Sequence, residues 1–111
     1  MQTITSIEEF EQLKAESEAL LVLFGGTQCN VCHSIKPKLQ ELVADAYPKM
    51  RQVYIDCHET TDLCSQNGIF SLPVVQIYFT GQKFIEEVRS FSLAAVVEQI
   101  ERPYHMLFAE A

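Results

Sequence analysis

The sequence predicts an α/β domain built on a mixed β-sheet, and three observations lead to this fold class. A continuous apolar run at residues 19–24 has the pattern of a strand buried on both faces. A helical stripe and a second strand-like run at 51–56 follow it, which is the order of a right-handed parallel strand–helix–strand unit. Two further runs, at 74–79 and 83–88, are separated by Thr80-Gly81, which is the spacing of an antiparallel hairpin. Parallel and antiparallel pairs together require a mixed sheet.

The composition fits a single globular domain over residues 1–111, in which residues 103–111 are expected to form a C-terminal extension. With 48% hydrophobic and 21% charged residues, the chain can bury about two-thirds of the surface that it exposes when unfolded. The formal net charge of -7 argues against nucleic acid or an anionic membrane as a partner, because clustered Lys and Arg recognise both. The N-terminus has neither the basic nor the apolar region of a secretory signal, so we expect a cytoplasmic protein.

The first two helices are predicted from a cap and from apolar spacing. Ser6 followed by Glu9 forms a capping box at the start of a helix over about 7–16. A second helix is expected from about Cys32 to Tyr47-Pro48, because one apolar stripe recurs at helical spacing. The residues of that stripe are Ile35, Leu39, Leu42, Val43 and Ala46.

The remaining elements are predicted less strongly. An extra strand is expected at 2–5, and a short helix is expected to begin near His58 and to end at Gly68. Ser92 can cap a last helix, and Pro103 is expected to end it at Arg102 because the residue before a proline disfavours helical backbone angles.

The stretch Cys29-Asn30-Val31-Cys32-His33 carries the candidate chemistry. Only the thiolate form of cysteine exchanges with a disulfide, and the free thiol has a pKa of about 8.5. Unpaired N–H groups and the dipole at a helix start favour an anion by about 0.3 to 1 kcal/mol. Cys29 lies just ahead of the predicted helix and Cys32 lies in its first turn. We therefore expect Cys29 to be the nucleophile and Cys32 to be the resolving cysteine.

The cysteines could also belong to a haem-attachment site or to a zinc site. C-x-x-C-H also attaches haem in c-type cytochromes, but that requires an export route, a second axial ligand and a helical wrap around the cofactor. Zinc could use Cys29, Cys32, Cys57 and Cys64, yet the last two are separated by six residues rather than two to four. We expect no metal and no cofactor other than a redox-active disulfide.

The motif and its surroundings together resemble the thioredoxin family. A buried strand precedes C-x-x-C, Pro37 follows it within the helix, and Ser-Leu-Pro-Val at 71–74 precedes the hairpin. The resemblance implies a thioredoxin-like three-layer α/β/α sandwich with a central mixed sheet of four or five strands. It implies a cis Leu72-Pro73 bond facing the dithiol and a substrate strand that pairs with the backbone of Leu72. It also implies exchange with protein disulfides and electrons from a thioredoxin reductase-type donor. We expect a monomer rather than a dimer.

The sequence departs from the family pattern at the site itself. Gln28 replaces the usual Trp, and Asn30-Val31 replaces Gly-Pro, so the substrate-binding surface of Gln28, Asn30 and Val31 differs from that of other thioredoxins. Leu23 stands where the family buries a proton-relaying aspartate, and Gln52 stands where its lysine partner would lie. The fold should tolerate this joint loss because no buried charge is left unpaired, whereas deprotonation of Cys32 should be slower.

Cys57 and Cys64 are expected to be reduced thiols, with Cys57 the more accessible. Some animal thioredoxins resemble this chain in carrying additional cysteines that can form a second disulfide. A seven-residue step in a regular helix separates Cα atoms by about 10 Å, beyond the limit of about 7 Å for a disulfide. Bridging would require the helix to start late or to unwind.

Pro37 and three histidines are candidate modulators or surface residues. His33 could stabilise the Cys29 thiolate if charged, or it could be an exposed helix residue without a role. Pro37 removes a helical N–H and is expected to kink the helix. His58 and His105 are expected to be surface residues.

The function predicted from the sequence is thiol–disulfide exchange with proteins, carried by Cys29 and Cys32. The alternative is a thioredoxin-like binding or assembly module with little redox turnover. The apolar tail residues Tyr104, Met106, Leu107 and Phe108 are expected to pack on the chain's own surface, with self-association as the alternative.

Overall fold

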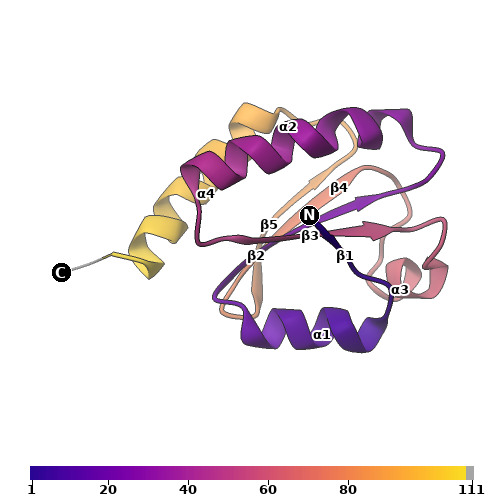
Figure 1. Ribbon diagram of the computed structural model, residues 1–111, viewed down its shortest axis with the longest axis horizontal. Coiled ribbons are helices and arrows are strands. Elements are labelled where there is room, and N and C mark those ends of the chain that lie inside the picture. The colour runs from indigo at the N-terminus through magenta and orange to yellow at the C-terminus, as the bar shows by residue number, and fades with distance from the viewer. Residues whose placement is uncertain (110–111) are drawn as a thin grey trace.

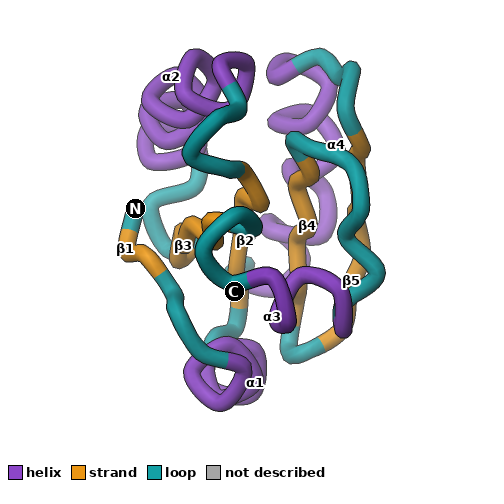
Figure 2. The backbone as a smooth tube through the Cα atoms, turned by 90° about the vertical axis from the view of Figure 1, so that its right-hand side faces the viewer, coloured by secondary structure: helices purple, strands orange, loops and turns teal. Residues whose placement is uncertain are grey.

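The computed structural model describes residues 1–109 and has three layers, with a twisted sheet between two pairs of helices (Figure 1). The strands are β1 (Gln2–Thr3), β2 (Ala19–Gly25), β3 (Arg51–Asp56), β4 (Val74–Phe79) and β5 (Gln82–Val88). The helices are α1 (Ile7–Glu16), α2 (Asn30–Ala46), α3 (Thr61–Gln66) and α4 (Leu93–Leu107). Helices α2 and α4 cover one face of the sheet, and α1 and α3 cover the other (Figures 1 and 2). This confirms the predicted α/β/α sandwich.

The sheet is mixed and has five strands in the order β1-β3-β2-β4-β5. Strand β3 is parallel to both β1 and β2, whereas β4 is antiparallel to β2 and to β5. Central strand β2 is buried along its whole length, as its continuous apolar sequence predicted. Its residues alternate between the two faces, so that Leu21 and Leu23 pack in the α2/α4 core and Leu20, Val22 and Phe24 in the α1/α3 core.

Local sequence signals position several elements as predicted. The Ser6 hydroxyl accepts a hydrogen bond of 3.1 Å from the Glu9 amide at the start of α1. The Ser92 hydroxyl accepts one of 3.2 Å from the Ala95 amide at the start of α4. Thr80 and Gly81 both adopt positive φ, 51° and 84°, which matches the right-handed twist of the hairpin that they connect.

Helix α4 runs through Pro103 to Leu107, so the predicted end at Arg102 is wrong. The reason is tertiary packing. Tyr104 is buried, its ring lies 4.8 Å from that of Tyr47, and its hydroxyl accepts a hydrogen bond of 3.0 Å from the Lys49 amide. These contacts hold the last turn in place although the proline supplies no helical N–H.

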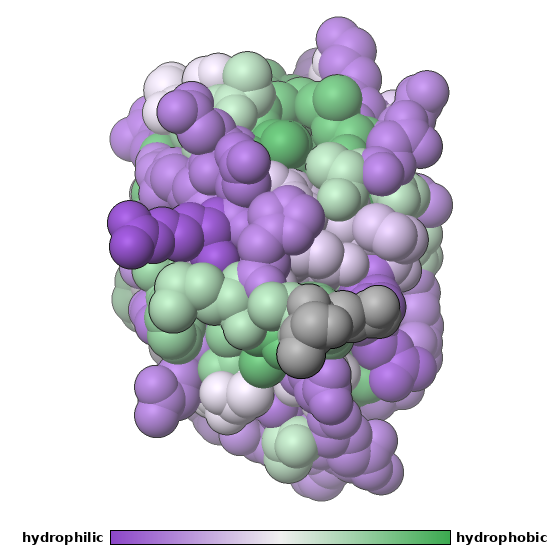
Figure 3. Space-filling view, turned by 90° about the vertical axis from the view of Figure 1, so that its left-hand side faces the viewer, coloured by the Kyte–Doolittle hydropathy of each residue, from purple (hydrophilic) through white to green (hydrophobic). Residues whose placement is uncertain are grey.

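The rest of the described tail also packs on the chain's own surface, as predicted. Leu107 and Phe108 contact the α2/α4 core, and the Phe108 ring lies 4.7 Å from the Tyr104 ring. Met106 is the exception, with 71% of its surface exposed. Figure 3 shows the face at this end of the molecule, where apolar residues alternate with polar ones. Within residues 1–109, no helix combines the length and hydrophobicity needed to cross a membrane.

Candidate active site

Cys29 and Cys32 lie at the junction between strand β2 and helix α2 and form a disulfide, with Cα atoms 5.2 Å apart. Helix α2 begins at Asn30 rather than at the predicted Cys32, and Cys29 is its N-cap. The Cys29 sulfur accepts a hydrogen bond of 3.2 Å from the Cys32 amide, in the place where a Ser or Asp oxygen usually caps a helix. The same amide would therefore face a thiolate on Cys29 after reduction.

The two sulfur-bearing residues differ in accessibility. Cys29 is half-buried, and its neighbours Gln28 and Asn30 are exposed, as is Val31. Cys32 has no exposed surface. A substrate sulfur can thus approach Cys29 from solvent, whereas Cys32 can be reached only from within the site.

Two consecutive glycines end strand β2 because side chains from β3 and the following turn approach them closely. A Cβ at Gly25 would collide with Tyr54 and lie 3.0 Å from the Cβ of Cys32. A Cβ at Gly26 would lie 2.5 Å from the imidazole of His58. The glycines allow the Cys29 loop to lie directly against these side chains.

The loop between β2 and Cys29 is tied to the turn that follows β3. The Thr27 hydroxyl donates a hydrogen bond of 2.6 Å to Asp56, and the Gln28 amide donates one of 3.2 Å to Nδ1 of His58. From the other side, Nε2 of His33 lies 2.9 Å from the Thr27 carbonyl oxygen. The predicted modulator His33 thus contacts the loop backbone.

His58 was expected to be a surface residue, and this expectation misses its contact with the site. Its ring is solvent-exposed on one side but covers Gly26 and bonds to Gln28 on the other. The order of the strands could have predicted this contact. His58 follows β3, the parallel neighbour of β2, and loops at the carboxyl ends of neighbouring parallel strands lie side by side.

Asp56 is the electrostatic anchor of this arrangement. Burial alone would raise the pKa of Asp56, but hydrogen bonds from the Thr27 hydroxyl and from the amides of His58 and Glu59 lower the pKa overall. The carboxylate is therefore held in its charged form. Burial, followed by the nearby charges of Asp56 and Glu59, raises the pKa of Tyr54 and keeps its hydroxyl protonated. The ammonium group of Lys36 lies 4.1 Å from the centre of the Tyr54 ring.

Leu23 and Gln52 occupy the two positions where the family pattern has a buried ion pair, and neither is charged. Leu23 is fully buried and lies opposite Tyr54 in β3 and Val75 in β4. Gln52 donates a hydrogen bond of 3.1 Å to the Gln40 carbonyl oxygen, and its own side-chain oxygen is buried without a partner. Among residues 1–109, Gln76 of β4 is the buried polar residue, so none of the described carboxylates is buried near Cys32.

The Leu72-Pro73 peptide bond is cis, as the resemblance implied. Pro73 is buried, and its carbonyl oxygen accepts a hydrogen bond of 2.7 Å from the Arg89 amide. Leu72 is half-buried and lines a surface hollow of about 290 Å³. His58, Cys57, Cys64 and Phe70 also line this hollow, and 81% of the Phe70 surface is exposed.

Cys57 and Cys64 form a second disulfide, so the expectation that they are reduced thiols is wrong. A helix beginning at His58 would have kept the two Cα atoms apart, but α3 begins only at Thr61. Residues 57–60 instead form a turn in which the Asp56 carbonyl oxygen accepts from the amides of Glu59 and Thr60. This late start brings the two Cα atoms to 5.6 Å. Cys57 is half-buried and Cys64 is almost fully buried, which is the predicted order of accessibility.

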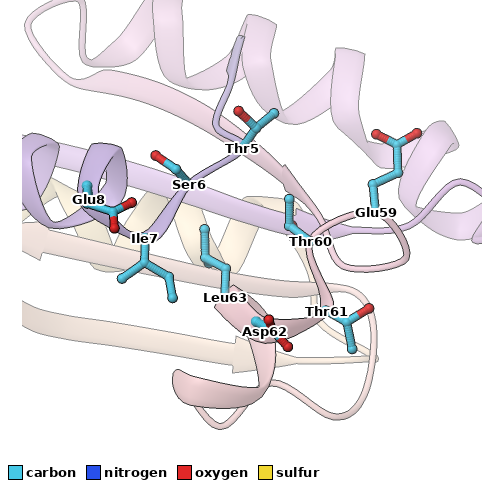
Figure 4. Close-up of a pocket in the computed structure, with 9 residues that line it drawn as sticks. All are labelled: Thr5, Ser6, Ile7, Glu8, Glu59, Thr60, Thr61, Asp62 and Leu63. Carbon is cyan, nitrogen blue, oxygen red and sulfur yellow. The ribbon is translucent and has the colours of Figure 1, made fainter.

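Another hollow, of about 400 Å³, lies between the start of α1 and helix α3 (Figure 4). It is lined by Thr5, Ser6, Ile7, Glu8, Glu59, Thr60, Thr61, Asp62 and Leu63. None of the predicted site residues lines it. Across residues 1–109, no group of three or more His, Cys, Asp or Glu side chains has an arrangement suited to a metal ion.

Comparison with known proteins agrees with this geometry. A thioredoxin-like protein of Bacillus subtilis (YdfQ) is 22% identical over 110 residues, covering 99% of this chain and 95% of that protein. A thioredoxin-like 3-2 protein of Arabidopsis thaliana is 28% identical over 91 residues, which are 81% of this chain but only 47% of that longer protein. A solved thioredoxin structure from Plasmodium falciparum superposes with a TM-score of 0.81 at 24% identity and covers 92% of this chain and 98% of its own.

The thioredoxin family model matches residues 2–102, which is most of the chain. The match includes the Cys29–Cys32 disulfide and all five strands of the sheet. The chain therefore belongs to the thioredoxin family, and it is a thiol–disulfide oxidoreductase.

Proposed function

We propose that Cys29 is the attacking cysteine and Cys32 the resolving cysteine in exchange with protein disulfides. The observation that carries this assignment is the hydrogen bond from the Cys32 amide to the Cys29 sulfur at the start of α2. Amides and the dipole at a helix start stabilise an anion, so Cys29 is the sulfur best suited to be a thiolate. Its accessibility, compared with the full burial of Cys32, supports the same order.

In the proposed reaction the Cys29 thiolate attacks one sulfur of the substrate disulfide. A bond forms between Cys29 and that sulfur, and the other substrate sulfur leaves as a thiolate. Cys32 then attacks the Cys29 sulfur, which closes the Cys29–Cys32 disulfide and releases the second substrate thiol. The substrate gains two electrons and the protein loses two.

The proton of Cys32 has to be removed before the second attack. The apolar surroundings of Leu23 offer no carboxylate to accept it. We propose that the departing substrate thiolate takes this proton, since it is released during exchange at this site and is a stronger base than a carboxylate. This route makes release of the mixed disulfide sensitive to the pKa of the leaving thiol.

Substrate docking is proposed along the backbone of Leu72, where an extended peptide can add to the site as a further strand. Pro73 shapes this segment, and the exposed side chains of Gln28, Asn30 and Val31 are proposed to contact the same substrate. Phe70 supplies an exposed aromatic surface on the same side, next to the hollow that Leu72 lines. We propose that Phe70 provides the apolar contact that Gln28 does not.

Members of the thioredoxin family act on protein disulfides and are recycled by a reductase. We propose a cytoplasmic reductase of the thioredoxin reductase type as the electron donor for this chain. The competing proposal is a binding or assembly module with little turnover. Leu23 in place of an acidic residue, and Gln28 in place of an aromatic one, favour that alternative.

Insulin reduction with dithiothreitol as the electron source separates the two. The wild type is expected to accelerate insulin precipitation, and the Cys29→Ser variant is expected to match dithiothreitol alone. His105→Leu, an exposed change on α4, serves as the control for general effects of substitution. Equal rates for the wild type and Cys29→Ser would favour the binding module.

A further inference from the structure

His58 contacts the backbone immediately before Cys29 although it lies 29 residues further along the chain. Its Nδ1 atom accepts a hydrogen bond of 3.2 Å from the amide of Gln28, the residue before Cys29. An imidazole nitrogen accepts a hydrogen bond only when it carries no proton. This contact therefore requires neutral His58 with its proton on Nε2.

The ring of His58 also sets the path of the loop by shape. It lies so close to Gly26 that a Cβ there would be 2.5, 2.5 and 2.9 Å from three ring atoms. Gly26 is buried although the flanking Thr27 is exposed. The imidazole thus covers the first residue of the loop and binds the last one before Cys29.

The segment that carries His58 is itself fixed on both sides. The Asp56 carboxylate accepts a hydrogen bond of 2.9 Å from the His58 amide and one of 2.6 Å from the Thr27 hydroxyl. On the other side, Cys57 is linked to Cys64 of α3 by the second disulfide. A side chain held in this way can hold the neighbouring loop in turn.

We propose that His58 is a positioning residue for disulfide exchange, which holds the Gln28 amide and so fixes where the Cys29 sulfur meets the α2 amides and the substrate. The inference rests on Cys29 being the attacking sulfur. His58 acts through the backbone and contacts neither sulfur in this assignment. Its removal leaves the Gln28 amide without a partner and the loop free to move away from the helix start.

The test compares two substitutions at this exposed position. His58→Leu keeps bulk over Gly26 but removes the acceptor, whereas His58→Asn keeps an acceptor oxygen close to the place of Nδ1. His105→Leu is the matched control, because it removes an exposed histidine elsewhere. For each protein, insulin reduction is measured together with hydrogen exchange of the Gln28 amide in ¹⁵N-labelled oxidised protein.

His58→Leu is expected to slow insulin reduction and to speed exchange of the Gln28 amide, each by about fivefold, which is the order of magnitude for one net hydrogen bond. His58→Asn should restore both to within about twofold of the wild type. A third variant, Gly26→Ala, should displace the ring and reproduce the loss caused by His58→Leu.

The proposal is overturned if His58→Leu has wild-type exchange at Gln28 and wild-type turnover, or if His58→Asn is as impaired as His58→Leu. If the chain does not catalyse disulfide exchange at all, the wild type will be no faster than Cys29→Ser, and this result is distinct from either outcome above. Thermal unfolding of each variant separates a folding defect from a local one. Equal melting temperatures with a slower His58→Leu support the positioning role.

Discussion

The two disulfides of the molecule follow neighbouring strands of the same sheet, yet their surroundings differ. Cys29–Cys32 lies at the start of the 17-residue helix α2. Cys29 is half-buried, and its sulfur accepts a hydrogen bond from a helix amide. Cys57–Cys64 joins a turn to the six-residue helix α3, and Cys64 has only 2% of its surface exposed. Burial does not separate the two pairs, because each joins a half-buried cysteine to a buried one, Cys32 or Cys64. The difference is the helix start, where the Cys32 amide can stabilise a thiolate on Cys29.

The difference indicates that the position of a disulfide, rather than its presence, decides its role. A half-buried sulfur that accepts a hydrogen bond from a helix-start amide suits exchange, and a link across a turn suits stabilisation. On this basis we infer that Cys29–Cys32 is the exchanging pair and that Cys57–Cys64 is a structural crosslink, which also holds the segment carrying His58.

The largest expected effect is on stability. Replacing Cys57 and Cys64 together by serine removes a crosslink around a loop of about eight residues, which should cost about 2.5 kcal/mol of unfolding free energy in the loop-entropy description. Urea unfolding of the oxidised proteins measures it. Insulin reduction by the same variant should stay within about threefold of the wild type, because Cys29 and Cys32 remain. Unchanged stability together with lost turnover would reverse the assigned roles.

The next effect is on the rate of reduction. Dithiothreitol should open Cys29–Cys32 at least about tenfold faster than Cys57–Cys64. Its first thiol attacks Cys29 and releases Cys32, and its second thiol then releases Cys29 as a thiolate that the Cys32 amide stabilises. Acid quenching, alkylation and peptide mass spectrometry follow both pairs in one sample. Equal rates would mean that the amide at the start of α2 does not favour release of Cys29.

Replacing Phe70 should have a smaller effect, limited to substrate binding near Cys29–Cys32. Phe70→Ser should raise the KM for insulin by about threefold and leave kcat nearly unchanged, because it removes an exposed apolar contact without creating a cavity. Met106→Ser is the matched control, because Met106 is similarly exposed but lies on α4. A fall in kcat for Phe70→Ser, or an equal rise in KM for Met106→Ser, would contradict docking at Phe70.

The smallest effect concerns Asp56, which connects the two regions through Thr27 and His58. Its pKa is lowered in the folded protein, so its contribution is present above the unfolded pKa of about 3.9 and is lost as pH falls through the folded pKa. Asp56→Asn should therefore lower the melting temperature slightly at pH 7 and show less further loss than the wild type between about pH 4 and pH 2. If the melting temperatures of Asp56→Asn and the wild type fall equally with pH across this range, the Asp56 carboxylate does not contribute to stability.

Much of the fold could be predicted from the sequence because local signals determine it. The caps at Ser6 and Ser92, the hairpin at Thr80-Gly81 and the apolar strand β2 act within a few residues of the chain. The pairing of Cys29 with Cys32 is local in the same sense.

The errors lie where distant contacts override local preference. Helix α4 continues through Pro103 because Tyr104 packs on Tyr47, and α3 starts at Thr61 with Cys57 bonded to Cys64. The role of His58 depends on which loops meet at the sheet edge. None of these contacts is visible in the spacing of neighbouring residues.

Trapping the mixed disulfide shows whether Cys29 or Cys57 attacks the substrate. In a Cys32→Ser variant the mixed disulfide cannot be resolved, so a substrate remains attached to the attacking sulfur. Reduced Cys32→Ser is incubated with intact, disulfide-bonded insulin, and the linked peptides are identified by mass spectrometry. We expect the insulin peptide on Cys29, with Cys57 still joined to Cys64 or alkylated as a free thiol. Insulin attached mainly to Cys57 would contradict the account.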